Sequence, residues 1–588
     1  MAEPQANGQE GLPLGPVTVA MRNLEGQLTR FRSGEITADE FKPARTILGY
    51  YGQRQPEKYM VRVRVPAGRL TSAQLRGLSS VARDYGNGTG HVTTRQNMQL
   101  HWLPLNEAPE LLWRLVDVGL TGLQTGGNSV RTVAACPLAG ACTREAFDVT
   151  PYAQAIDNRF LGDKTVMGLP RKIKTSLSGC AVDCSYTAIQ DFGAIAEIRQ
   201  GTDGQEHRGF RVFIGGGLGV LPQAAQQLED FTPAEDLVLT CEAMLRVFDR
   251  LGERKNKTKA RLKFLLRRLG IAEVRRLIQE EREKLRASST STAPVKTADN
   301  GAPDKPTPAP NADRQVVSAE YQRWLKWNVV KQRGGGGLYV VRVPLVLGDA
   351  TSAQMDAVAA IADLFGDGEV RTTQHQNLVL RGIQEASLPA TYRVLTNVGL
   401  TSVRAEGIGD VVSCPGATAC SLAITSSKGL ARELSAMLTS PAYQEDEALS
   451  GLRVKVSGCP DSCGQHYLAD IGMYGCALHN SGRLYPAFQL VLAGEVTEEG
   501  TSLAQPVTKV PARRVPQALA RLLEHYRTQR LPDERYAAYV DRMGLDTFRR
   551  LLRDLTVVPS PDEDPSFYVD WDATRMYVVE RGEGECAV

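Results

Sequence analysis

The chain has 588 residues, which is too long for a single hydrophobic core and predicts several domains. Its 69 Lys and Arg nearly balance its 66 Asp and Glu, and no basic stripe or acidic tail points to nucleic acid. Eleven cysteines in so long a chain do not make a disulfide scaffold, and eight fall in close pairs, as ligands do. Without a secretory signal or an apolar run long enough to span a membrane, the chain is predicted to be cytoplasmic.

The first elements can be predicted from composition and periodicity. Residues 1–16 are rich in Gly, Pro and Gln, which predicts a disordered N-terminus. Leu28 to Phe41 is predicted to form a short, charged helix. Tyr59 to Pro66 alternates apolar with basic residues, the pattern of a half-buried strand that ends at a proline, and a helix is predicted from Ser72 to Asp84.

Further along, the chain repeats itself. Tyr59 to Val63 recurs as Tyr339 to Val343, 280 residues later. Two more segments recur at the same offset: Thr71-Ser72-Ala73-Gln74 as Thr351-Ser352-Ala353-Gln354, and Val118-Gly119-Leu120-Thr121 as Val398-Gly399-Leu400-Thr401. So constant an offset predicts two tandem copies of one fold, packed with pseudo-twofold symmetry. In each copy the order of strands and helices indicates a small ferredoxin-like α+β unit followed by a larger α/β unit.

A compositional break separates the two copies. Residues 287–316 are mostly Ala, Ser, Thr, Pro, Asp and Lys without an aromatic residue, which predicts a flexible linker. The stretch before it, Thr258 to Arg286, has a strongly charged helical pattern. A solvated helix face is the simpler interpretation of this stretch, and a contact with a donor protein is the alternative.

Both copies carry a C-x5-C pair followed by a C-x3-C pair, set among Gly, Pro and small residues. In the second copy the four thiols are Cys414, Cys420, Cys459 and Cys463. Four soft thiolates suit either zinc or an iron–sulfur cluster. Zinc sites favour gaps of two to four residues, so the longer C-x5-C gap favours a cluster, with zinc and coincidental buried thiols as alternatives.

The pattern Cys414-x5-Cys420, followed by Ser-Gly-Cys459-Pro-x2-Cys463-Gly-Gln, resembles the signature of the sirohaem-dependent nitrite and sulfite reductases. Further matches are Thr93-Thr94-Arg95-Gln96-Asn97, Asn128-Ser129-Val130-Arg131 and Leu169-Pro170-Arg171-Lys172-Ile173-Lys174, within a resemblance that runs from about Tyr50 to about Leu552. The resemblance implies that the second-copy thiols hold a [4Fe-4S] cluster and that Cys463 also bridges to the sirohaem iron.

The same resemblance implies a domain plan. It consists of ferredoxin-like half-domains at 17–125 and 317–405, sirohaem/4Fe-4S-type domains at 126–286 and 406–557, and a C-terminal tail at 558–588. The expected fold class is therefore α+β, with tandem-duplicated nitrite/sulfite reductase architecture.

Four basic residues of the first copy are the candidate catalytic residues. Sirohaem is a polycarboxylate and its substrates are small oxyanions, so the pocket must supply cations, and the resemblance places Arg95, Arg131, Lys172 and Lys174 on the substrate side of the sirohaem. Arginine holds an oxyanion through a rigid fork of donors, whereas lysine also offers an acidic proton. Taken alone, Arg171 to Lys174 would be interpreted as an exposed strand of alternating charge. In this family, lysine at the position of Lys174 is more typical of sulfite than of nitrite reduction.

The resemblance also implies cofactor-binding roles outside these cations. The glycines Gly215, Gly216 and Gly217 would let the backbone approach the sirohaem, although the run does not match a dinucleotide-binding fingerprint. The other predicted cofactor-binding residues are Gln96, Asn97 and Gln465. A packed turn is the alternative for Gln465 and His466. The remaining thiols, Cys241, Cys476 and Cys586, lack partners at ligand spacing and are interpreted as ordinary cysteines.

The first copy keeps a quartet of its own: Cys136, Cys142, Cys180 and Cys184. Many fused members of the family keep cysteines in the second copy only, so this quartet holds either a second cluster or relict thiols. The repeat maps the four catalytic candidates to His375, Gly409, Gly451 and Arg453, of which only Arg453 is surely charged. The sequence thus argues against a second catalytic centre and leaves a second cluster, acting as an electron relay, open.

These observations predict an oxidoreductase that reduces sulfite to sulfide, or nitrite to ammonia, with six electrons at a sirohaem coupled to a [4Fe-4S] cluster. No flavin-binding or NADPH-binding domain is visible, so the electrons should come from ferredoxin or another external donor protein. Two alternatives remain: an enzyme like precorrin-3B synthase of cobalamin synthesis, and a non-catalytic iron–sulfur electron carrier.

Overall fold

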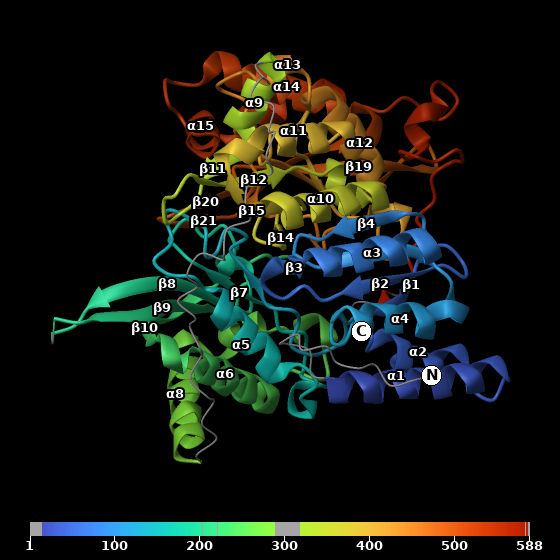
Figure 1. Cartoon of the computed structure of the whole chain (residues 1–588). Helices are drawn as coiled ribbons and strands as arrows, with labels where there is room; N and C mark the ends of the chain where they lie inside the picture. The colour runs from blue at the N-terminus through green and yellow to red at the C-terminus, as the bar shows by residue number, and fades with distance from the viewer. Residues whose placement is uncertain (1–13, 203, 220, 289–317, 583, 586–588) are drawn as a thin grey trace.

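The computed structural model describes residues 14–202, 204–219, 221–288, 318–582 and 584–585. The first copy lies in the lower half of Figure 1 and the second in the upper half. The elements of the first copy are α1 (Leu14–Arg32), α2 (Ala38–Thr46), β1 (Tyr50–Gly52), β2 (Tyr59–Val63), β3 (Arg69–Thr71), α3 (Ser72–Tyr85), β4 (Thr89–Val92), β5 (Met98–Leu103), α4 (Ala108–Asp117), β6 (Ala134–Ala135), α5 (Thr150–Phe160), β7 (Thr175–Ser178), β8 (Phe192–Gln200), β9 (Glu206–Ile214), β10 (Gln226–Pro233), α6 (Leu237–Leu251), α7 (Leu262–Leu269) and α8 (Ile271–Ala287).

The second copy repeats most of this order. Its elements are α9 (Ala319–Asn328), β11 (Val329–Lys331), β12 (Leu338–Val343), β13 (Asp349–Thr351), α10 (Ser352–Phe365), β14 (Glu369–Thr372), β15 (Leu378–Gln384), α11 (Leu388–Asn397), β16 (Val412–Ser413), α12 (Ser427–Leu438), α13 (Pro441–Gln444), β17 (Val454–Ser457), β18 (Ile471–Asn480), β19 (Arg483–Leu492), β20 (Glu495–Thr497), β21 (Gly500–Ser502), β22 (Gln505–Pro511), α14 (Val515–Gln529), α15 (Tyr536–Met543) and α16 (Leu545–Leu551).

The two half-domains exchange a strand. Their sheets have the orders β1-β2-β5-β4-β13 and β11-β12-β15-β14-β3, so each sheet ends in a short strand from the other copy. Both exchanged pairs are antiparallel, with Ala350 opposite Gly90 and Leu70 opposite Val370. One hydrophobic core, which includes Leu75 of α3 and Met355 of α10, runs through both half-domains. The duplication predicted from the sequence is therefore an interlocked pair.

The helices α3 and α10 start alike and meet at the junction of the copies. Each begins with a capping box, Thr71 with Gln74 and Thr351 with Gln354, which satisfies the first free N–H groups of the helix. The hydroxyl of Ser79 donates to the carbonyl of Ser352 at 3.0 Å, and the hydroxyl of Ser352 donates back to the carbonyl of Ser79 at 3.1 Å. Ser79 and Ser352 are not equivalent in the repeat, so these bonds simply join the two helices; the pseudo-twofold axis shows in the exchanged strands, where Leu70 is equivalent to Ala350 and Gly90 to Val370.

The cysteines follow the ends of neighbouring parallel strands. In each larger unit the first three strands run parallel, β6-β7-β8 and β16-β17-β18, and the rest of the sheet is antiparallel. Cys136 follows β6 and Cys180 follows β7, while Cys414 follows β16 and Cys459 follows β17. Because carboxyl ends of parallel neighbours meet at one sheet edge, each C-x5-C loop lies beside its C-x3-C turn.

The N-terminal region differs from the prediction. The helix predicted from Leu28 to Phe41 is wrong, because α1 ends at Arg32 and Gly34 turns the chain with φ of 76°. A new helix, α2, then begins after Thr37, whose capping box with Glu40 fixes its start. Because α1 begins at Leu14, residues 14–16 of the segment predicted to be disordered are helical. The rest of that segment, and most of the predicted linker, lie outside the described residues.

The predicted C-terminal tail returns to the first copy. Beyond α16 it runs along the loop that carries Cys414 and Cys420, where the hydroxyl of Tyr577 donates to the carbonyl of Ile424 at 2.8 Å. Near its end Glu585 forms a bidentate ion pair with Arg45 of α2 at 2.6 Å. Within the described part of the chain, no helix is both long and apolar enough to cross a membrane.

Candidate active site

The second-copy quartet is ordered around Cys414 and the turn after β17. The thiol of Cys414 accepts from the N–H of Gly458 at 3.2 Å and lies 3.3 Å from the hydroxyl of Ser427, contacts that would stabilise a thiolate there. Burial, and then the neighbouring Cys414, raise the pKa of Cys463 to about 11, and burial with the Cys463 charge raises that of Cys459. Cys414 and Cys463 therefore lie close enough to Cys459 to act on its charge, as ligands of one cluster would.

Cys463 faces a recess rather than packed protein. It is the exposed member of the quartet, yet burial is the main cause that raises its pKa. Three basic residues are similarly half-exposed, and burial is the main cause that lowers their pKa: Arg95, Lys172 and Lys174. We call the partly exposed region that these side chains share the recess in front of Cys463.

The catalytic candidates of the first copy lie close together at this recess. After burial, the charges of Arg261, Arg95 and Lys172 lower the pKa of Lys174, and the Cys463 thiolate opposes them. Burial, followed by the charge of Arg131, lowers the pKa of Lys172 to about 7, again against Cys463. Lys172 and Lys174 therefore lie within electrostatic reach of the thiol that ends the second-copy quartet, and Arg131 and Arg95 lie close to these two lysines.

Each arginine is held by backbone or amide oxygens. Arg95 donates to the side-chain oxygen of Gln190 at 2.8 Å and to the carbonyl of Thr132 at 2.6 Å. Arg131 donates to the carbonyls of Thr125 and Gly127. The neutral partners of Arg95 fix its guanidinium group without cancelling its charge, so that charge stays available to an anion.

A fifth cation, Arg261, was missed by the sequence analysis. It pairs with Asp191 at 2.8 Å, and Asp191 also accepts from the backbone N–H of Lys174 at 2.9 Å. Its charge is the first one that lowers the pKa of Lys174. Arg261 lies 87 residues beyond Lys174 in a segment without any motif, so no sequence signal identified it.

A direct contact joins the cations to the cysteine turn. The hydroxyl of Thr94, next to Arg95, donates to the carbonyl of Cys463 at 2.8 Å. In return, the side-chain amide of Gln465 donates to the carbonyl of Thr94 at 3.2 Å. Gln465 has a left-handed backbone with φ of 58°, which turns its side chain toward the first copy. The segment that carries Arg95 is thus fastened to the turn that carries Cys463.

The glycine run approaches the same turn from the first copy. A Cβ atom on Gly219 would lie 3.7 Å from the carbonyl oxygen of Asp461, between Cys459 and Cys463, and one on Gly217 would lie 3.1 Å from Arg261. Gly215 and Gly216 are confined by the protein itself, because a Cβ there would lie 2.7 Å from Leu266 and 2.5 Å from the carbonyl of Ala188. The run therefore combines close packing with an approach to the recess.

Gln96 and Asn97 are occupied by backbone groups. The amide of Gln96 donates to the carbonyl of Thr372 at 2.7 Å and accepts from the N–H of Ala135 at 2.9 Å, and Asn97 accepts from the N–H of Val65 at 3.2 Å. Both side chains are buried, at 0% and 5% exposure. The structure places these two predicted cofactor-binding residues at the junction of the copies, from where they can support the recess only indirectly.

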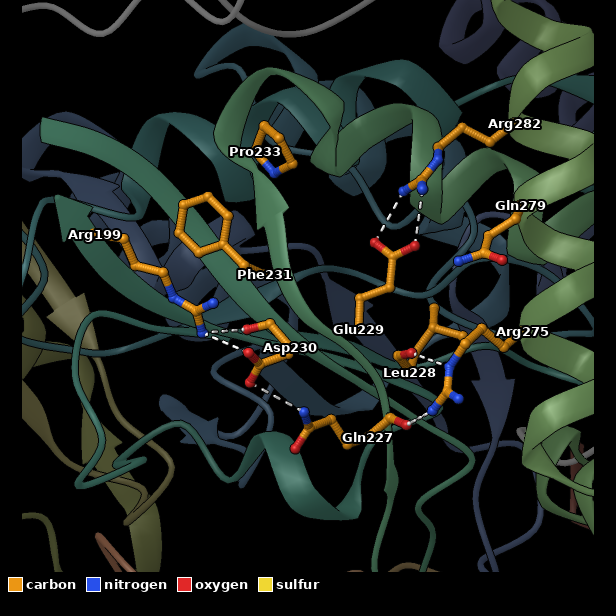
Figure 2. A pocket seen from close by; sticks show the side chains of 10 residues that line it. All are labelled: Arg199, Gln227, Leu228, Glu229, Asp230, Phe231, Pro233, Arg275, Gln279 and Arg282. Carbon is orange, nitrogen blue, oxygen red and sulfur yellow. Dashed lines mark hydrogen bonds and ion pairs between the residues drawn. The ribbon is translucent and has the colours of Figure 1, made fainter. Parts of the chain in front are cut away.

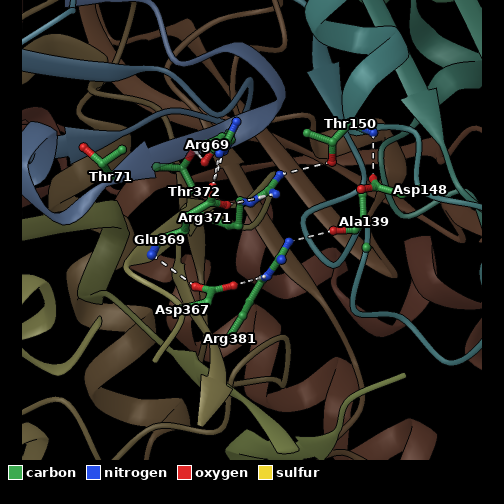
Figure 3. A network of polar contacts seen from close by, with 12 residues as sticks. Arg69, Thr71, Ala139, Asp148, Thr150, Asp367, Glu369, Arg371, Thr372 and Arg381 are labelled. Atoms are coloured by element: carbon green, nitrogen blue, oxygen red, sulfur yellow. Dashed lines mark hydrogen bonds and ion pairs between the residues drawn. The ribbon is translucent and has the colours of Figure 1, made fainter. Parts of the chain in front are cut away.

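The first-copy quartet also forms a cluster of thiols. Cys180 raises the pKa of Cys142, and Cys136 raises that of Cys184, so the four side chains lie next to one another. Arginines of the second copy hold their loop: Arg381 donates to the carbonyl of Ala139 at 2.8 Å, and Arg333 donates to the carbonyl of Glu145 at 3.0 Å. Figure 3 shows Arg381 reaching from Asp367 to Ala139, with Arg371 close by.

The lining in front of Cys184 has mixed charge. His375, in place of Arg95, accepts or donates a bond with the hydroxyl of Tyr186 at 2.8 Å, and burial lowers its pKa to about 3. The charge of Glu406 raises the pKa of both Cys184 and Tyr186, and Arg453 lowers that of Tyr186. A neutral imidazole and a carboxylate make this lining less suited to a polycarboxylate than the one in front of Cys463.

A second hollow lies away from both quartets. It is an open groove of about 620 Å³ between β10 and α8 (Figure 2), in which Arg282 pairs with Glu229 at 2.9 Å and Arg199 pairs with Asp230 at 3.0 Å. Arg282 and Arg199 are thus already neutralised by carboxylates, while Arg275 donates to the backbone carbonyls of Leu228 and Gln227. No set of three or more His, Cys, Asp or Glu among the residues that the structure describes is arranged to hold a single metal ion.

The arrangement of tandem half-domains and cysteine-bearing domains matches one protein family. The description "Nitrite and sulphite reductase 4Fe-4S domain" fits residues 126–286 and 404–558, and "Nitrite/Sulfite reductase ferredoxin-like half domain" fits residues 51–118 and 330–398. The chain belongs to this nitrite and sulphite reductase family. The predicted family and the predicted tandem fold are confirmed, while the individual domain boundaries stay predictions.

The chain is similar to named members along most of its length. It is 28% identical to the assimilatory ferredoxin-dependent nitrite reductase of Haloferax mediterranei, covering 85% of this chain and 84% of that one. It is 30% identical to the ferredoxin–nitrite reductase of Synechococcus elongatus (80% and 86% covered) and 29% identical to the ferredoxin sulfite reductase of Mycobacterium tuberculosis (84% and 83% covered). The solved structure of the Mycobacterium tuberculosis NirA protein superposes with a TM-score of 0.73 at 27% identity, over 87% of this chain and 92% of that one.

Proposed function

We propose that this chain reduces sulfite or nitrite with electrons from ferredoxin or a similar external donor protein. The relatives named above are ferredoxin-dependent reductases of one or the other anion, and family membership implies an iron–sulfur cluster and a sirohaem. The observation that carries the proposal is the convergence of Arg95, Lys172 and Lys174 with Cys463 on one recess. A cytoplasmic location is part of the proposal.

The residues present fit both groups. Cys414, Cys420, Cys459 and Cys463 would hold the [4Fe-4S] cluster, since the charges of Cys414 and Cys463 both act on Cys459 and the thiol of Cys414 already accepts an N–H. Cys463 alone opens onto the cationic recess, where a polycarboxylate would be neutralised. The sirohaem, when bound, supplies an iron centre that ligates the oxyanion and delivers electrons one at a time.

The cations have separate tasks in this proposal. Arg95 and Arg131, fixed by neutral oxygens, would hold the anion and the carboxylates of the cofactor through their planar forks. Each oxygen that leaves sulfite or nitrite takes up protons to become water, so a proton donor is needed beside it. Lys172, whose pKa is lowered to about 7, and Lys174 are suited to give that proton and to regain it from water.

Sulfite is the favoured substrate, because the family resemblance associates a lysine at position 174 with sulfite reduction. The purified holoenzyme, supplied with reduced ferredoxin, should form sulfide from sulfite with a higher kcat/KM than it forms ammonia from nitrite. A higher value for nitrite would reverse the substrate assignment. Formation of neither product, with no red-region sirohaem absorbance, would refute the proposal and favour the electron-carrier or precorrin-3B synthase alternatives.

We extend the proposal to a second [4Fe-4S] cluster on Cys136, Cys142, Cys180 and Cys184, which would relay electrons without catalysing the reduction. Its support is the mutual influence of these thiols and the way Arg381 and Arg333, each paired with a carboxylate, hold their loop through its backbone carbonyls. Iron analysis should give about nine irons per chain, against about five for one cluster and a sirohaem. A value of about five would leave the first quartet without a cluster.

A further inference from the structure

One buried lysine lies between the two cysteine sites and has no part in the function proposed above. Lys455 is on β17, four residues before Cys459, and its side chain is 0% exposed. Its ammonium nitrogen lies 3.3 Å from the side-chain oxygen of Gln465 and 3.4 Å from the hydroxyl of Tyr186. It also lies 4.6 Å from the centre of the Tyr186 ring, a cation–π contact.

The two residues that Lys455 contacts are equivalent in the repeat. Gln465 follows Cys463 by two residues, and Tyr186 follows Cys184 by two. Both have left-handed backbones, with φ of 58° and 57°, and both extend across the pseudo-twofold axis. The side chain of Gln465 reaches Thr94 of the first copy, and that of Tyr186 reaches His375 of the second. Lys455 therefore contacts both cysteine turns at once.

Strand register identifies the matching position in the first copy. Lys455 is opposite Val412 in the β16–β17 pair, and Ser176 is opposite Ala134 in the β6–β7 pair. Ser176 is buried too, but its hydroxyl donates to the carbonyl of Ser185 at 2.8 Å and stays within its own copy. Two lysines facing each other across the axis would repel, so this place accommodates one cation only.

The contacts continue unbroken from one site to the other. From the Cys184 side they run from His375 to Tyr186 and Lys455, and from there through Gln465 and Thr94 to the carbonyl of Cys463. Every one of these side chains is buried or half-buried. A buried ammonium is expensive to desolvate unless it is hydrogen-bonded, so Gln465 and Tyr186 are held firmly in their present orientations.

We propose that Lys455 is a positioning residue that fixes the Cys463 turn through Gln465, and couples it to the Cys184 turn through Tyr186. This inference rests on the proposed function, because its effect is exerted on the cofactors at Cys463. Fixing that turn keeps the Cys463 thiolate in one geometry. Burial lowers the pKa of Lys455 to about 7, and in its protonated form the amine stabilises the added electron of a reduced cluster. Lys455 itself touches neither substrate nor cysteine.

The test compares holoenzymes of wild type, Lys455→Met, Lys455→Arg and Tyr186→Phe, with Ser176→Ala as the control at the matching register position. The readouts are the sirohaem absorbance, the EPR signature of haem–cluster coupling, and the midpoint potential of the cluster. In Lys455→Met we expect a shifted EPR signature, a lower midpoint potential and a kcat that falls about tenfold with little change in KM. Lys455→Arg should recover the potential, and Ser176→Ala should match wild type.

Tyr186→Phe is the sharpest variant, because it removes a single oxygen from the Cys184 side. It should nevertheless change the EPR signature of the cofactors at Cys463, which a purely local role of Tyr186 would leave alone. Unchanged signatures and potentials in both Lys455→Met and Tyr186→Phe would overturn the inference. If Lys455→Met does not fold, Tyr186→Phe and Lys455→Arg decide it by the same criteria. A wild type without sirohaem or cluster signals would instead refute the proposed function.

Discussion

The recesses in front of Cys463 and Cys184 are built on the same scaffold but differ in charge. In both, a thiol follows a parallel strand, and a left-handed residue two positions later extends to the other copy. The recess at Cys463 is lined by the arginines and lysines of the first copy. The one at Cys184 has His375 and Arg453 where the repeat places Arg95 and Lys174, and the carboxylate of Glu406 lies there among the cations Arg342, Arg453 and Lys455.

This difference shows how a duplicated protein can divide its tasks without changing its backbone. A cluster on either quartet would be compensated, because arginines or N–H groups surround both cysteine loops. A cofactor with many carboxylates, together with an anionic substrate, requires an excess of cations that only one recess supplies. The comparison therefore separates electron storage, which both sites could perform, from substrate chemistry, which belongs to one. Substitutions of equivalent residues in the two copies test this difference between the recesses.

The largest expected effect comes from the last cysteine of each quartet. Cys463→Ser should lose the sirohaem absorbance and at least about 1000-fold in activity, because the thiolate shared by both cofactors is gone. Cys184→Ser should keep the sirohaem and stay within about tenfold of wild-type activity, because no tetrapyrrole depends on it. Absorbance spectra and steady-state rates measure both. Loss of sirohaem from Cys184→Ser would contradict the division between the sites.

The next effect tests Lys174 against its repeat equivalent, Arg453. Lys174→Met should lower kcat/KM by about 100-fold, since a proton donor and an anion-binding charge are both removed. Arg453→Met should change kcat/KM by less than about threefold, because Arg453 faces the Cys184 recess. Equal losses in the two variants would mean that both recesses take part in turnover.

A pH profile distinguishes the recesses through Lys172. Burial and neighbouring cations lower its pKa to about 7, so the proton that it gives to a leaving oxygen is present below this pH and lost above it. The log of kcat/KM should therefore fall with a slope approaching one above about pH 7. Lys172→Arg should remove this limb, because arginine stays protonated. The equivalent residue of the second copy, Gly451, cannot titrate. If Lys172→Arg still shows the fall of kcat/KM above about pH 7, that fall belongs to another group.

The smallest effect concerns stability near the Cys184 recess. Burial raises the pKa of Asp410 to about 7, so between about pH 4 and 7 the folded protein keeps a proton that the unfolded chain has lost. This group should lower the free energy of unfolding as pH rises, by at most about 1.4 kcal/mol per pH unit. Asp410→Asn should flatten that slope in denaturant unfolding between pH 4 and 7. An identical slope in the variant would show that Asp410 is ionised throughout.

Much of the candidate site could be predicted because its residues occur in short, dense motifs. The cysteine pairs and the segment around Lys172 and Lys174 each lie within a few residues, and the repeat places one copy beside the other. Arg261 and Lys455 could not be found this way. A lone arginine and a lone strand lysine look like ordinary surface residues, and only the folded chain shows that one pairs with Asp191 and that the other is fully buried.

Prediction of the fold from the sequence is limited in the same way. The helices α3 and α10 follow from their periodicity and capping boxes, whereas the exchange of β3 and β13 does not, because three-residue strands carry no pattern. Gln96 and Asn97 lie in a matching motif, yet their side chains bond backbone groups. Gln96 bonds Thr372 across the junction and Ala135 within the first copy, and Asn97 bonds Val65. A motif locates a residue near a site but does not say whether its side chain faces the ligand or the protein.

The exchanged strands also constrain how this molecule can come into being. Because β13 completes the first sheet and β3 completes the second, either half alone would expose an unpaired edge and half of a shared apolar core. Neither half could mature first and wait for the other, so cofactor loading must follow the meeting of both. Because the two copies are on one chain, they are always present in equal number. Each cysteine-bearing half therefore always has the partner that supplies its cations and its last strand.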